Sequence, residues 1–503
     1  MRSRPALYVV ALSVALAALY LVATPHTTDL SAQTARADLF RRSGFVPYWA
    51  GWYGGITTTS YSLVTPPLLG LFGAVWLGAL SIVATALVVL PLLRDSLRPS
   101  LGAGAFVVAA YLDVFSGRTT FAVGAVVALA TLLAIERNRR LVAVLLAIVT
   151  AAASPVAGFL LLVVVVALVI ADEPRRRAAA TAAAGVVVTF GGLAILARGD
   201  VGGYQPFSDA SFLLAVGTAA VVGLSPVGRR VRVAAGVTIV TMTGVYFVHS
   251  AVGSNVLRLT VLAAVPTLVA AVRLQRWQLG AVVALAAVSP VTQLGYDVGQ
   301  IGVDDTSASF VAPLRSRLAT DPAVVDHRVE IVDTATHWPS TFLLPRVALA
   351  RGWERQTDET RNPIFYGQAP LTAASYRQFL NTNAVEAVAV AVGVKLDYGS
   401  RRESALIAKG LPYLHRIWSS AHWQLYAVAS PDPIIAAPAQ VVSTSDTGLT
   451  VHVPVAGSYA VRMHWSPYLV VNGGVVTRAS DGDVNLALRS SGTHRLHAVW
   501  RLP

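Results

Sequence analysis

The sequence predicts a polytopic α-helical membrane protein with a C-terminal extracytoplasmic α/β unit and a β-sandwich. Three observations predict this class. Hydrophobic residues make up 55% of the 503 residues, and the mean hydropathy is +0.60. Charged residues make up 13%, against roughly 25% in soluble domains. From about residue 295 the long apolar runs give way to short segments that alternate apolar and polar residues.

The apolar runs predict about eleven transmembrane helices, each of which needs roughly 20 mostly apolar residues. The first run follows two arginines and lacks a clear cleavage site, so we expect an uncleaved membrane helix. Two of the shorter runs meet at Ser154-Pro155, and one broken hairpin is the alternative there. The runs cover residues 6–23, 66–93, 101–115, 119–135, 141–153, 155–171, 178–197, 210–224, 233–249, 256–272 and 278–294.

Arginines between these runs predict the orientation. With the N-terminus inside, the cytoplasmic segments up to residue 294 carry 15 arginines, Arg2 and Arg4 among them, and the opposite side carries six. Positive residues favour the cytoplasm. We therefore expect a cytoplasmic N-terminus, an odd number of spans and an extracytoplasmic C-terminal portion in the cell membrane. The net charge of +13 follows from this pattern, which forms no basic stripe, so we expect no nucleic-acid partner.

Three domains are expected: a transmembrane domain over residues 1–294 with a long first external loop at 24–65, an extracytoplasmic α/β domain over 295–430 and a β-sandwich over 431–503. In the α/β domain "VDHRVEIVDTATHW" and "NAVEAVAVAVGVKLD" predict buried strands, and "LTAASYRQFLNTN" predicts a helix between them. In the third domain the alternating segments from "GLTVHVPV" to "THRLHAVW" predict antiparallel strands.

Several classes of chemistry are excluded by what the sequence lacks. There is no cysteine, hence no disulfide, thiolate metal site or cysteine nucleophile. The Walker, HExxH and GxSxG patterns are absent as well. Two lysines stand against many arginines and alanines, which favours a GC-rich genome, such as that of an actinobacterium.

The first external loop holds the leading catalytic candidate. Asp38 lies in "RADLFRRSGFVPYWAGWYGG", and a loop of this length is usually functional. Its carboxylate suits proton transfer from a sugar hydroxyl, or a metal bound to a phosphate; a solvated ion pair with Arg41 or Arg42 is the alternative. The nearby Trp49, Trp52 and Tyr53 fit an interfacial aromatic belt, which we favour, and could also stack on a sugar.

Two external helix ends carry further candidates. Asp113 and Arg118 bracket the tight connection "DVFSGR", where an arginine fork suits a phosphate; a local ion pair that closes the hairpin is the alternative. His249, Asn255 and Arg258 lie in "HSAVGSNVLRL". Arg258 begins an apolar run, which is unfavourable unless an anion meets it or the side chain snorkels to the interface.

In the C-terminal portion, "THWPSTFLLPRVALARGWERQTDETRNPIFY" concentrates rings and charges, among them His337, Trp353 and Arg355. Rings and guanidinium groups suit sugars, so a glycan groove is one interpretation of this segment. Packing of an α/β domain onto the membrane unit is the other, and we favour it.

Taken together, the early loop acid, the aromatic stretch "VPYWAGWYGGITTTSYSLVTPPLLGLFG", the many helices and the external domain resemble the GT-C superfamily of integral membrane glycosyltransferases. The resemblance is strongest to the bacterial branch labelled 6-pyruvoyl-tetrahydropterin-synthase-related membrane protein. The external "GSYAVRMHWSPYLVVNGG" is similar to the β-domains that end such proteins. The matching motif consists of Trp49, Tyr53, Gly54, Gly55, Tyr61, Pro66 and Pro67.

This resemblance implies transfer of a sugar from a polyprenyl-phosphate donor to an envelope glycan or lipid acceptor, with a loop acid as general base. By position that acid is Asp38, with Asp29 as the weaker substitute. The paired-acid motif of many members is missing, which leaves the use of a divalent cation open; no other cofactor is implied. The remaining expected site residues are Arg118, Arg258 and Arg41 for the donor phosphate, and Trp49, Trp52, Tyr53, Asp113, His249 and Asn255 for substrate.

Two other functions stay open on the sequence. A transporter or flippase of an envelope lipid or glycan needs no general base, but it would usually show discontinuous helices or a two-fold repeat. A non-catalytic scaffold for envelope assembly would account for the single unpaired loop acid.

Overall fold

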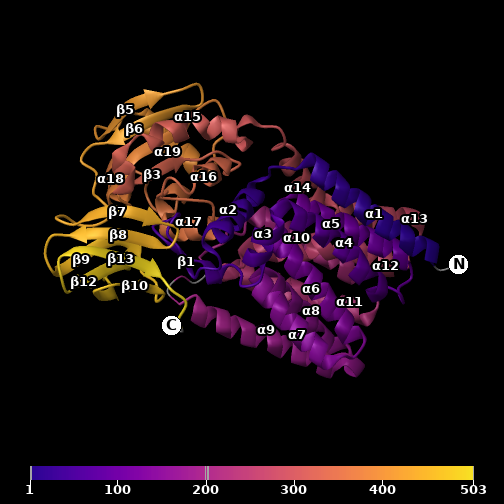
Figure 1. Ribbon diagram of the computed structural model, residues 1–503. Helices are drawn as coiled ribbons and strands as arrows, with labels where there is room; N and C mark the ends of the chain where they lie inside the picture. The colour runs from indigo at the N-terminus through magenta and orange to yellow at the C-terminus, as the bar shows by residue number, and fades with distance from the viewer. Residues whose placement is uncertain (1–2, 199, 201–202, 502–503) are drawn as a thin grey trace. The chain divides into compact units, whose positions relative to one another are not determined.

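A computed structural model describes residues 3–198, 200 and 203–501 of the chain. Arg2, which counts toward the predicted N-terminal charge, lies outside the described residues. The chain divides into two compact units, and each is coloured by sequence in Figure 1. The first unit holds residues 1–37, 61–193 and 204–301, and the second holds 38–60, 194–203 and 302–503. Both units therefore take part of the predicted first loop.

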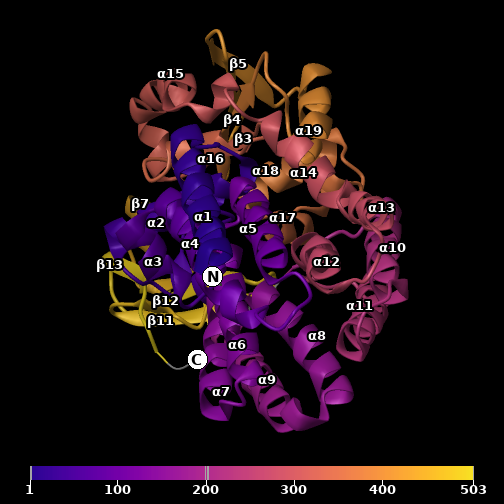
Figure 2. The ribbon, with the colours of Figure 1, turned by 90° about the vertical axis from the view of Figure 1, so that its right-hand side faces the viewer.

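Helices make up the first unit (Figures 1 and 2). Most of them begin or end at the prolines, glycines and arginine clusters that separate the apolar runs. The described helices are α1 (Ser3–Ala23), α2 (Thr28–Ser43, which ends in the second unit), α3 (Thr65–Phe72), α4 (Ala74–Leu92), α5 (Pro99–Phe115), α6 (Thr119–Glu136), α7 (Arg140–Ala153), α8 (Pro155–Ala171), α9 (Arg176–Leu196), α10 (Asp209–Leu224), α11 (Arg229–Phe247), α12 (Leu257–Ala271), α13 (Arg276–Ala286) and α14 (Val288–Val298).

Each of the eleven predicted apolar runs coincides with a helix or a helix pair. Among the described residues, five helical segments are long and apolar enough to cross a membrane, and the pair α13–α14, bent by 50°, would make a sixth. Four further helices (α5, α7, α8 and α10) are apolar but shorter. The predicted class is confirmed: the protein is a polytopic helical membrane protein with a C-terminal portion that contains β-sheet.

Small residues let the helices of the first unit approach closely. A Cβ added at Gly102 of α5 would lie 2.5 Å from the Cβ of Ala270 in α12, and one at Gly158 of α8 would lie 2.7 Å from the Cα of Ala151 in α7. Without water to drive apolar side chains together, such contacts supply the packing in a membrane protein. The predicted break before Pro155 is present: α7 ends at Ala153, and Ser154 caps α8 by accepting a hydrogen bond from the amide of Ala157.

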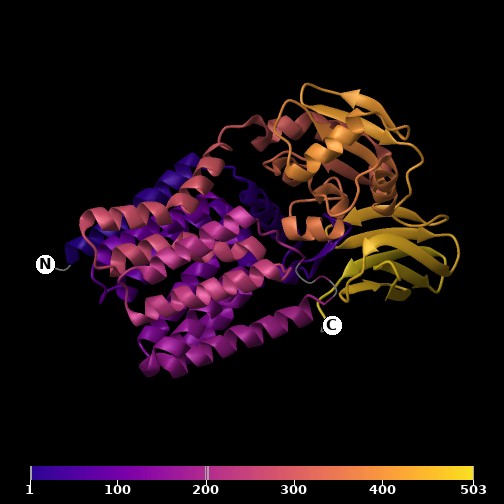
Figure 3. The ribbon, with the colours of Figure 1, turned by 180° about the vertical axis from the view of Figure 1, so that it is seen from behind.

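The second unit contains an α/β sheet of strand order β3-β4-β6-β5, drawn in orange shades in Figures 1 and 3. β3 and β4 are parallel, and the other pairs are antiparallel. Both strands expected here, and the helix between them, are confirmed. The elements are α15 (Ala308–Ala319), β3 (Arg328–Val332), α16 (Trp338–Leu343), α17 (Arg355–Arg361), α18 (Ala373–Thr382), β4 (Val385–Ala391), α19 (Tyr398–Ala408), β5 (Leu414–Ser419) and β6 (Trp423–Val428), with a small hairpin of β1 (Tyr48–Trp49) and β2 (Ile56–Thr57) from the first loop.

Two further antiparallel sheets, of strand order β10-β13-β8-β7 and β11-β12-β9, form the predicted β-sandwich, drawn in yellow. Inward-facing residues such as Val451, Leu486 and Leu496 make its core. Two of its strands, β7 and β11, were not predicted, because their side chains are largely exposed and give no apolar alternation. The strands are β7 (Gln440–Ser445), β8 (Gly448–Val453), β9 (Gly457–His464), β10 (Leu469–Val471), β11 (Gly474–Arg478), β12 (Asp483–Leu488) and β13 (Gly492–Ala498).

Candidate functional site

The first loop contains a helix, α2, that the sequence analysis did not predict. Its ends suit the helix dipole, because Asp29 lies in the first turn and Arg41 and Arg42 lie in the last. In the first unit α2 presents Asp29, Gln33 and Arg36 at spacings of four and three residues, which places them on one face. The helix therefore brings these three polar residues onto one face. An irregular loop, as expected from the sequence, would not have aligned them.

This face of α2 meets Tyr61 and the first turn of α6. Gln33, which is 2% exposed, accepts a hydrogen bond from the hydroxyl of Thr120 at 2.6 Å and donates one to the hydroxyl of Tyr61 at 2.6 Å. The guanidinium carbon of Arg36 lies 3.7 Å from the centre of the Tyr61 ring, a cation–π distance. Since both groups of the amide are used, Gln33 fixes α2 against α6.

Arg118 lies between α5 and α6 and contacts two acids. Its Nε donates to Oδ2 of Asp29 at 3.2 Å, and its Nη1 lies 3.7 Å from Oδ1 of Asp113. The preceding Gly117 has a φ of +83°, and a Cβ there would lie 2.3 Å from the amide nitrogen of Leu30 in α2. Glycine thus lets this connection turn tightly beside α2 and bring Arg118 to Asp29.

Arg258 belongs to the same cluster but has a different set of partners. Its charge interacts with those of Arg118, Asp113 and Asp29, and its guanidinium carbon lies 4.8 Å from the centre of the Phe121 ring. Within the described part of the chain, the structure pairs it with no carboxylate. A partly buried guanidinium without an acid partner is well suited to bind an anion.

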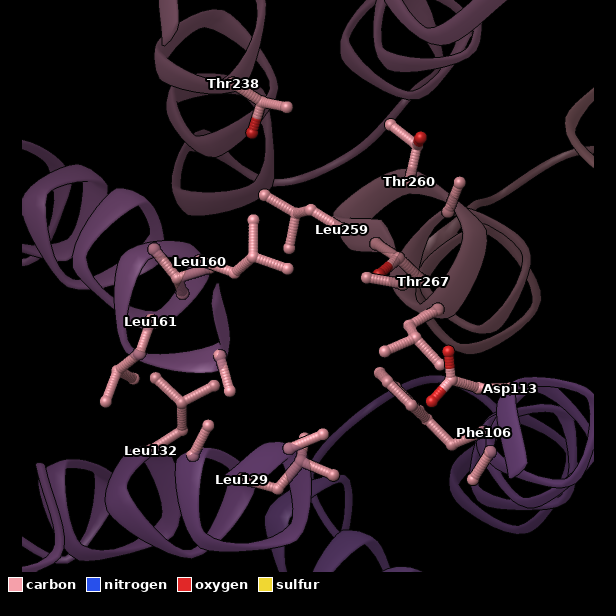
Figure 4. A pocket seen from close by; sticks show the side chains of 18 of the residues that line it. Phe106, Asp113, Leu129, Leu132, Leu160, Leu161, Thr238, Leu259, Thr260 and Thr267 are labelled. Atoms are coloured by element: carbon pink, nitrogen blue, oxygen red, sulfur yellow. The ribbon is translucent and has the colours of Figure 1, made fainter. Parts of the chain in front are cut away.

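An apolar cavity of about 280 Å³ adjoins this cluster. Helices α4, α5, α6, α8, α10, α11 and α12 enclose it, and leucines, alanines and threonines make most of its wall (Figure 4). Asp113 and Phe121 both line it. Oδ2 of Asp113 is buried and has no hydrogen-bond partner among the described residues. The first unit thus places a charged group of residues beside a space suited to an apolar chain.

Asp38 and Arg41, the predicted base and one predicted phosphate ligand, belong to the second unit. Nη1 of Arg41 donates to Oδ1 of Asp38 at 2.9 Å, and their side chains are 48% and 44% exposed. This is the solvated ion pair that the sequence analysis gave as the alternative. Arg118, Arg258 and Asp113, by contrast, lie together in the first unit with Asp29.

Trp49, Trp52 and Tyr53 are buried in the second unit, each at most 1% exposed. The two indole rings lie 4.5 Å apart, and the Tyr53 hydroxyl donates to the carbonyl of Gly352 at 2.7 Å. The expectation of an interfacial belt is wrong for these three side chains, because no ring face is open to lipid. The same burial leaves no surface for stacking on a sugar.

His249 and Asn255 lie near the start of α12 in the first unit. The His249 ring is exposed and packs against Tyr204, with 4.9 Å between ring centres. Asn255 is 8% exposed and donates to the carbonyl of Ala251 at 3.4 Å. Neither side chain has a contact that ties it to the Arg118 cluster in the described structure, so their predicted roles in binding substrate stay predictions.

The charged segment of the α/β domain forms a buried network within the second unit. Arg351 pairs with Glu330, Asp358 and Glu403. Nearby, the His337 ring stacks on Trp353 at 3.7 Å. These contacts hold one side of the α/β sheet together.

His337 bridges two acids of this network. Its Nδ1 lies 3.2 Å from Asp333 and its Nε2 lies 3.4 Å from Asp397. Burial alone would lower the pKa of His337, but its contacts with these carboxylates raise it above the ordinary value. Arg355 makes a two-pronged contact with the same Asp397, so the histidine belongs to a fixed ionic structure.

Among the described residues, no three acidic or histidine side chains are grouped as a metal site would require.

No family model matches the chain, and no curated protein sequence matches it. Solved structures of ArnT from Cupriavidus metallidurans are similar in arrangement. The one bound to undecaprenyl phosphate has 14% identity and a TM-score of 0.46, over 84% of this chain and 98% of that one. The one in the apo state has 14% identity and a TM-score of 0.48, over 84% and 99%. Likeness at this level concerns the course of the chain and carries no conclusion about activity.

Proposed function

We propose that this protein is a membrane glycosyltransferase that moves a sugar from a polyprenyl-phosphate donor to an envelope glycan or lipid acceptor on the extracytoplasmic face. The observation that carries the proposal is the position of the Arg118 and Arg258 cluster beside the apolar cavity. A polyprenyl-phosphate sugar joins an apolar chain to an anionic phosphodiester head, so it needs both features at one place. The resemblance of the sequence to the GT-C superfamily points to the same class of donor.

In this proposal Arg258 is the principal ligand of the donor phosphate, because among the described residues no carboxylate forms a salt bridge with it, although the charges of Asp113 and Asp29 act on it. Arg118 is the second, although Asp29 and Asp113 already contact it. Both guanidinium groups would stabilise the charge that develops on the phosphate as the sugar leaves. Arg41 is less suited, because its partner is Asp38 in the second unit.

We assign the general base to Asp29 in preference to Asp38. Asp29 lies in the same unit as Arg118 and keeps 36% of its side chain exposed, so an acceptor hydroxyl can reach it. In the reaction the acceptor oxygen bonds to the anomeric carbon and the bond from that carbon to the phosphate oxygen breaks. The hydroxyl proton passes to the carboxylate of Asp29, and polyprenyl phosphate leaves.

The test is mass spectrometry of envelope glycans and lipid-linked sugars from a deletion strain complemented with native protein, Asp29→Asn or Asp38→Asn at equal expression. We expect the deletion to lose one glycosyl unit and accumulate its lipid donor. Native protein and Asp38→Asn should restore the unit, and Asp29→Asn should not.

If Asp38→Asn alone failed to restore the glycosyl unit, the general base would be Asp38, as the sequence predicted. Unchanged glycans and donors in the deletion strain, or full rescue by both variants, would contradict the transferase and favour transport or scaffolding.

A further inference from the structure

The last turn of α14 and the residues just after it contain two buried polar side chains that the reaction described above does not use. Asp297 is 3% exposed and Gln300 is 6% exposed. Asp297 lies in the last turn of an apolar helix pair that meets the requirements of a membrane span, and Gln300 follows this pair. An acid in such a segment is costly and usually has a function. Their contacts lead to the two segments that carry the charged cluster.

Asp297 contacts the connection that holds Arg118. Its Oδ2 accepts a hydrogen bond from the hydroxyl of Ser116, two residues before Arg118, and its Oδ1 accepts one from Nε2 of Gln293 at 2.9 Å. Its charge also interacts with Arg118. Both carboxylate oxygens are therefore occupied, and one of them fixes the C-terminal end of α5.

Gln300 contacts the segment that holds Asp29. Its Oε1 accepts hydrogen bonds from the backbone amide of Thr28 at 2.9 Å and from the Thr28 hydroxyl at 3.0 Å. Thr28 is the first residue of α2, and Asp29 follows it. One amide oxygen thus satisfies the first N–H of the helix, which has no partner within the helix, and fixes the helix start.

We propose that Asp297 and Gln300 are positioning residues: Asp297 holds Arg118 through Ser116, and Gln300 holds Asp29 through Thr28. This rests on the proposed function, in which Arg118 binds the donor phosphate and Asp29 takes the acceptor proton. The two residues are separated by only one turn, so a single helix end sets the distance between the phosphate ligand and the base. A displacement of about 1 Å at either group is enough to slow such a reaction as much as a hundredfold.

The two halves of the proposal predict different kinetic effects. Loss of the Asp297–Ser116 bond should raise the KM for the lipid donor, because it loosens a phosphate ligand. Loss of the Gln300–Thr28 bonds should lower kcat, because it displaces the base while the phosphate site stays intact. If the two residues only stabilised the fold, their loss would not change KM for the lipid donor or kcat independently of the other constant.

The experiment uses the full chain in lipid nanodiscs with Ser116→Ala, Asp297→Asn, Gln300→Leu and Gln300→Glu. Thr292→Ala is the matched control, since Thr292 is an exposed residue of α14 that bonds only to its own helix at Val288. Hydrogen exchange is measured over residues 113–120 and 27–31, and binding of undecaprenyl phosphate is measured by native mass spectrometry. Steady-state transfer is then measured with the donor found by glycan analysis.

We expect Ser116→Ala and Asp297→Asn to raise exchange over residues 113–120 and weaken undecaprenyl phosphate binding about tenfold. Gln300→Leu should raise exchange over 27–31 and lower kcat about tenfold with binding unchanged. Gln300→Glu, which still accepts both bonds, should restore kcat, and Thr292→Ala should behave as native protein.

Native exchange and native constants in the Asp297 and Gln300 variants would overturn the positioning roles while leaving the proposed function standing. The positioning roles would also be overturned if the Asp297 and Gln300 variants both changed KM and kcat to the same extent. If native protein failed to bind undecaprenyl phosphate, the proposed function would fail, and the positioning roles with it.

Discussion

The guanidinium of Arg258 lies over the Phe121 ring, in a cluster where the other buried arginine already has acid partners. We expect Arg258→Gln to weaken undecaprenyl phosphate binding by about ten- to a hundredfold, because it removes hydrogen bonds to a charged group. Arg258→Lys keeps the charge but loses the planar fork, so its loss should be smaller. Native mass spectrometry in nanodiscs gives both values.

Arg94→Gln is the control for this prediction, because Arg94 pairs with Asp95 and is 69% exposed. Equal binding by native protein and Arg258→Gln would remove Arg258 from the phosphate site.

Gly117 carries a second prediction at the scale of a single residue. Its positive φ and the 2.3 Å approach to Leu30 leave no room for a side chain. We expect Gly117→Ala to lower the free energy of unfolding by about 1–3 kcal/mol and to displace Arg118, with loss of sugar transfer. Thermal unfolding of the solubilised chain measures the first effect, and glycan analysis of the complemented strain measures the second.

Gly217 offers a matched comparison, because a Cβ there meets nothing within 4 Å. Since it lies inside α10, Gly217→Ala should leave stability unchanged or raise it by about 0.5–1 kcal/mol. Two alanine variants of equal stability would contradict the role of the tight turn.

At the scale of the helices, the cavity should bind the lipid chain rather than the head. Ala128 of α6 and Ala263 of α12 both line it, so Ala128→Phe or Ala263→Phe would fill part of the space. We expect either variant to bind undecaprenyl phosphate more weakly by about tenfold, while a short-chain isoprenyl phosphate binds as it does to native protein. Competition between the two lipids in native mass spectrometry measures this difference.

Ala11→Phe, at an exposed position of α1, is the control for added volume outside the cavity. Equal loss of the long-chain and short-chain lipids would show that the variants disturb the phosphate site instead.

At the scale of a whole unit, buried acids make stability depend on pH. Burial raises the pKa of Glu359 to about 7 and that of Glu386 to about 7, and the contacts of His337 raise its pKa despite burial. All three groups hold protons more tightly in the folded chain, so stability falls as pH rises through these values. His464, whose pKa burial lowers, acts in the opposite direction, but only as pH falls below about 6.5.

We therefore expect the second unit to be less stable at pH 8 than at pH 6.5, by about 1.5 kcal/mol for Glu359 and Glu386 together. Hydrogen exchange of β3 and β4 in the full chain, corrected for the intrinsic effect of pH, measures this change. The double variant Glu359→Gln, Glu386→Gln should reduce the slope but not abolish it, because burial also raises the pKa of Glu403 to about 7 and that of Glu330 well above its ordinary value. A second unit that is more stable at pH 8 would contradict the assignment.

Much of the architecture was predictable because it depends on local composition. Every apolar run became a helix or a helix pair, and β3, β4 and most of the sandwich strands follow from alternating or continuous apolar residues. The helix α2 was missed because its sequence, "TDLSAQTARADLFRRS", has no apolar stripe. Its end residues, with an acid first and arginines last, were the available signal.

The site was predictable only in part. Arg118, Arg258 and Asp113 stood out because charges beside apolar runs are costly, and the structure brings them together. Gln33, Arg36 and Tyr61 were missed as site residues, since their grouping depends on a helix that the sequence did not reveal. Asp38 was the predicted base because of its neighbours in the sequence. In the structure, however, its carboxylate forms an ion pair with Arg41.

The sequence by itself determined that the chain enters a membrane, where its apolar helices and most of its apolar strands lie, and which charges stand at costly positions. These properties depend on the free energy of transferring each segment from water, and that depends on nearby residues alone. Only the tertiary structure decided that Asp29 meets Arg118, that three aromatic residues of the first loop are buried, and that the end of α14 contacts both site segments. Such contacts join residues up to 299 positions apart, and their existence depends on packing that local composition does not encode.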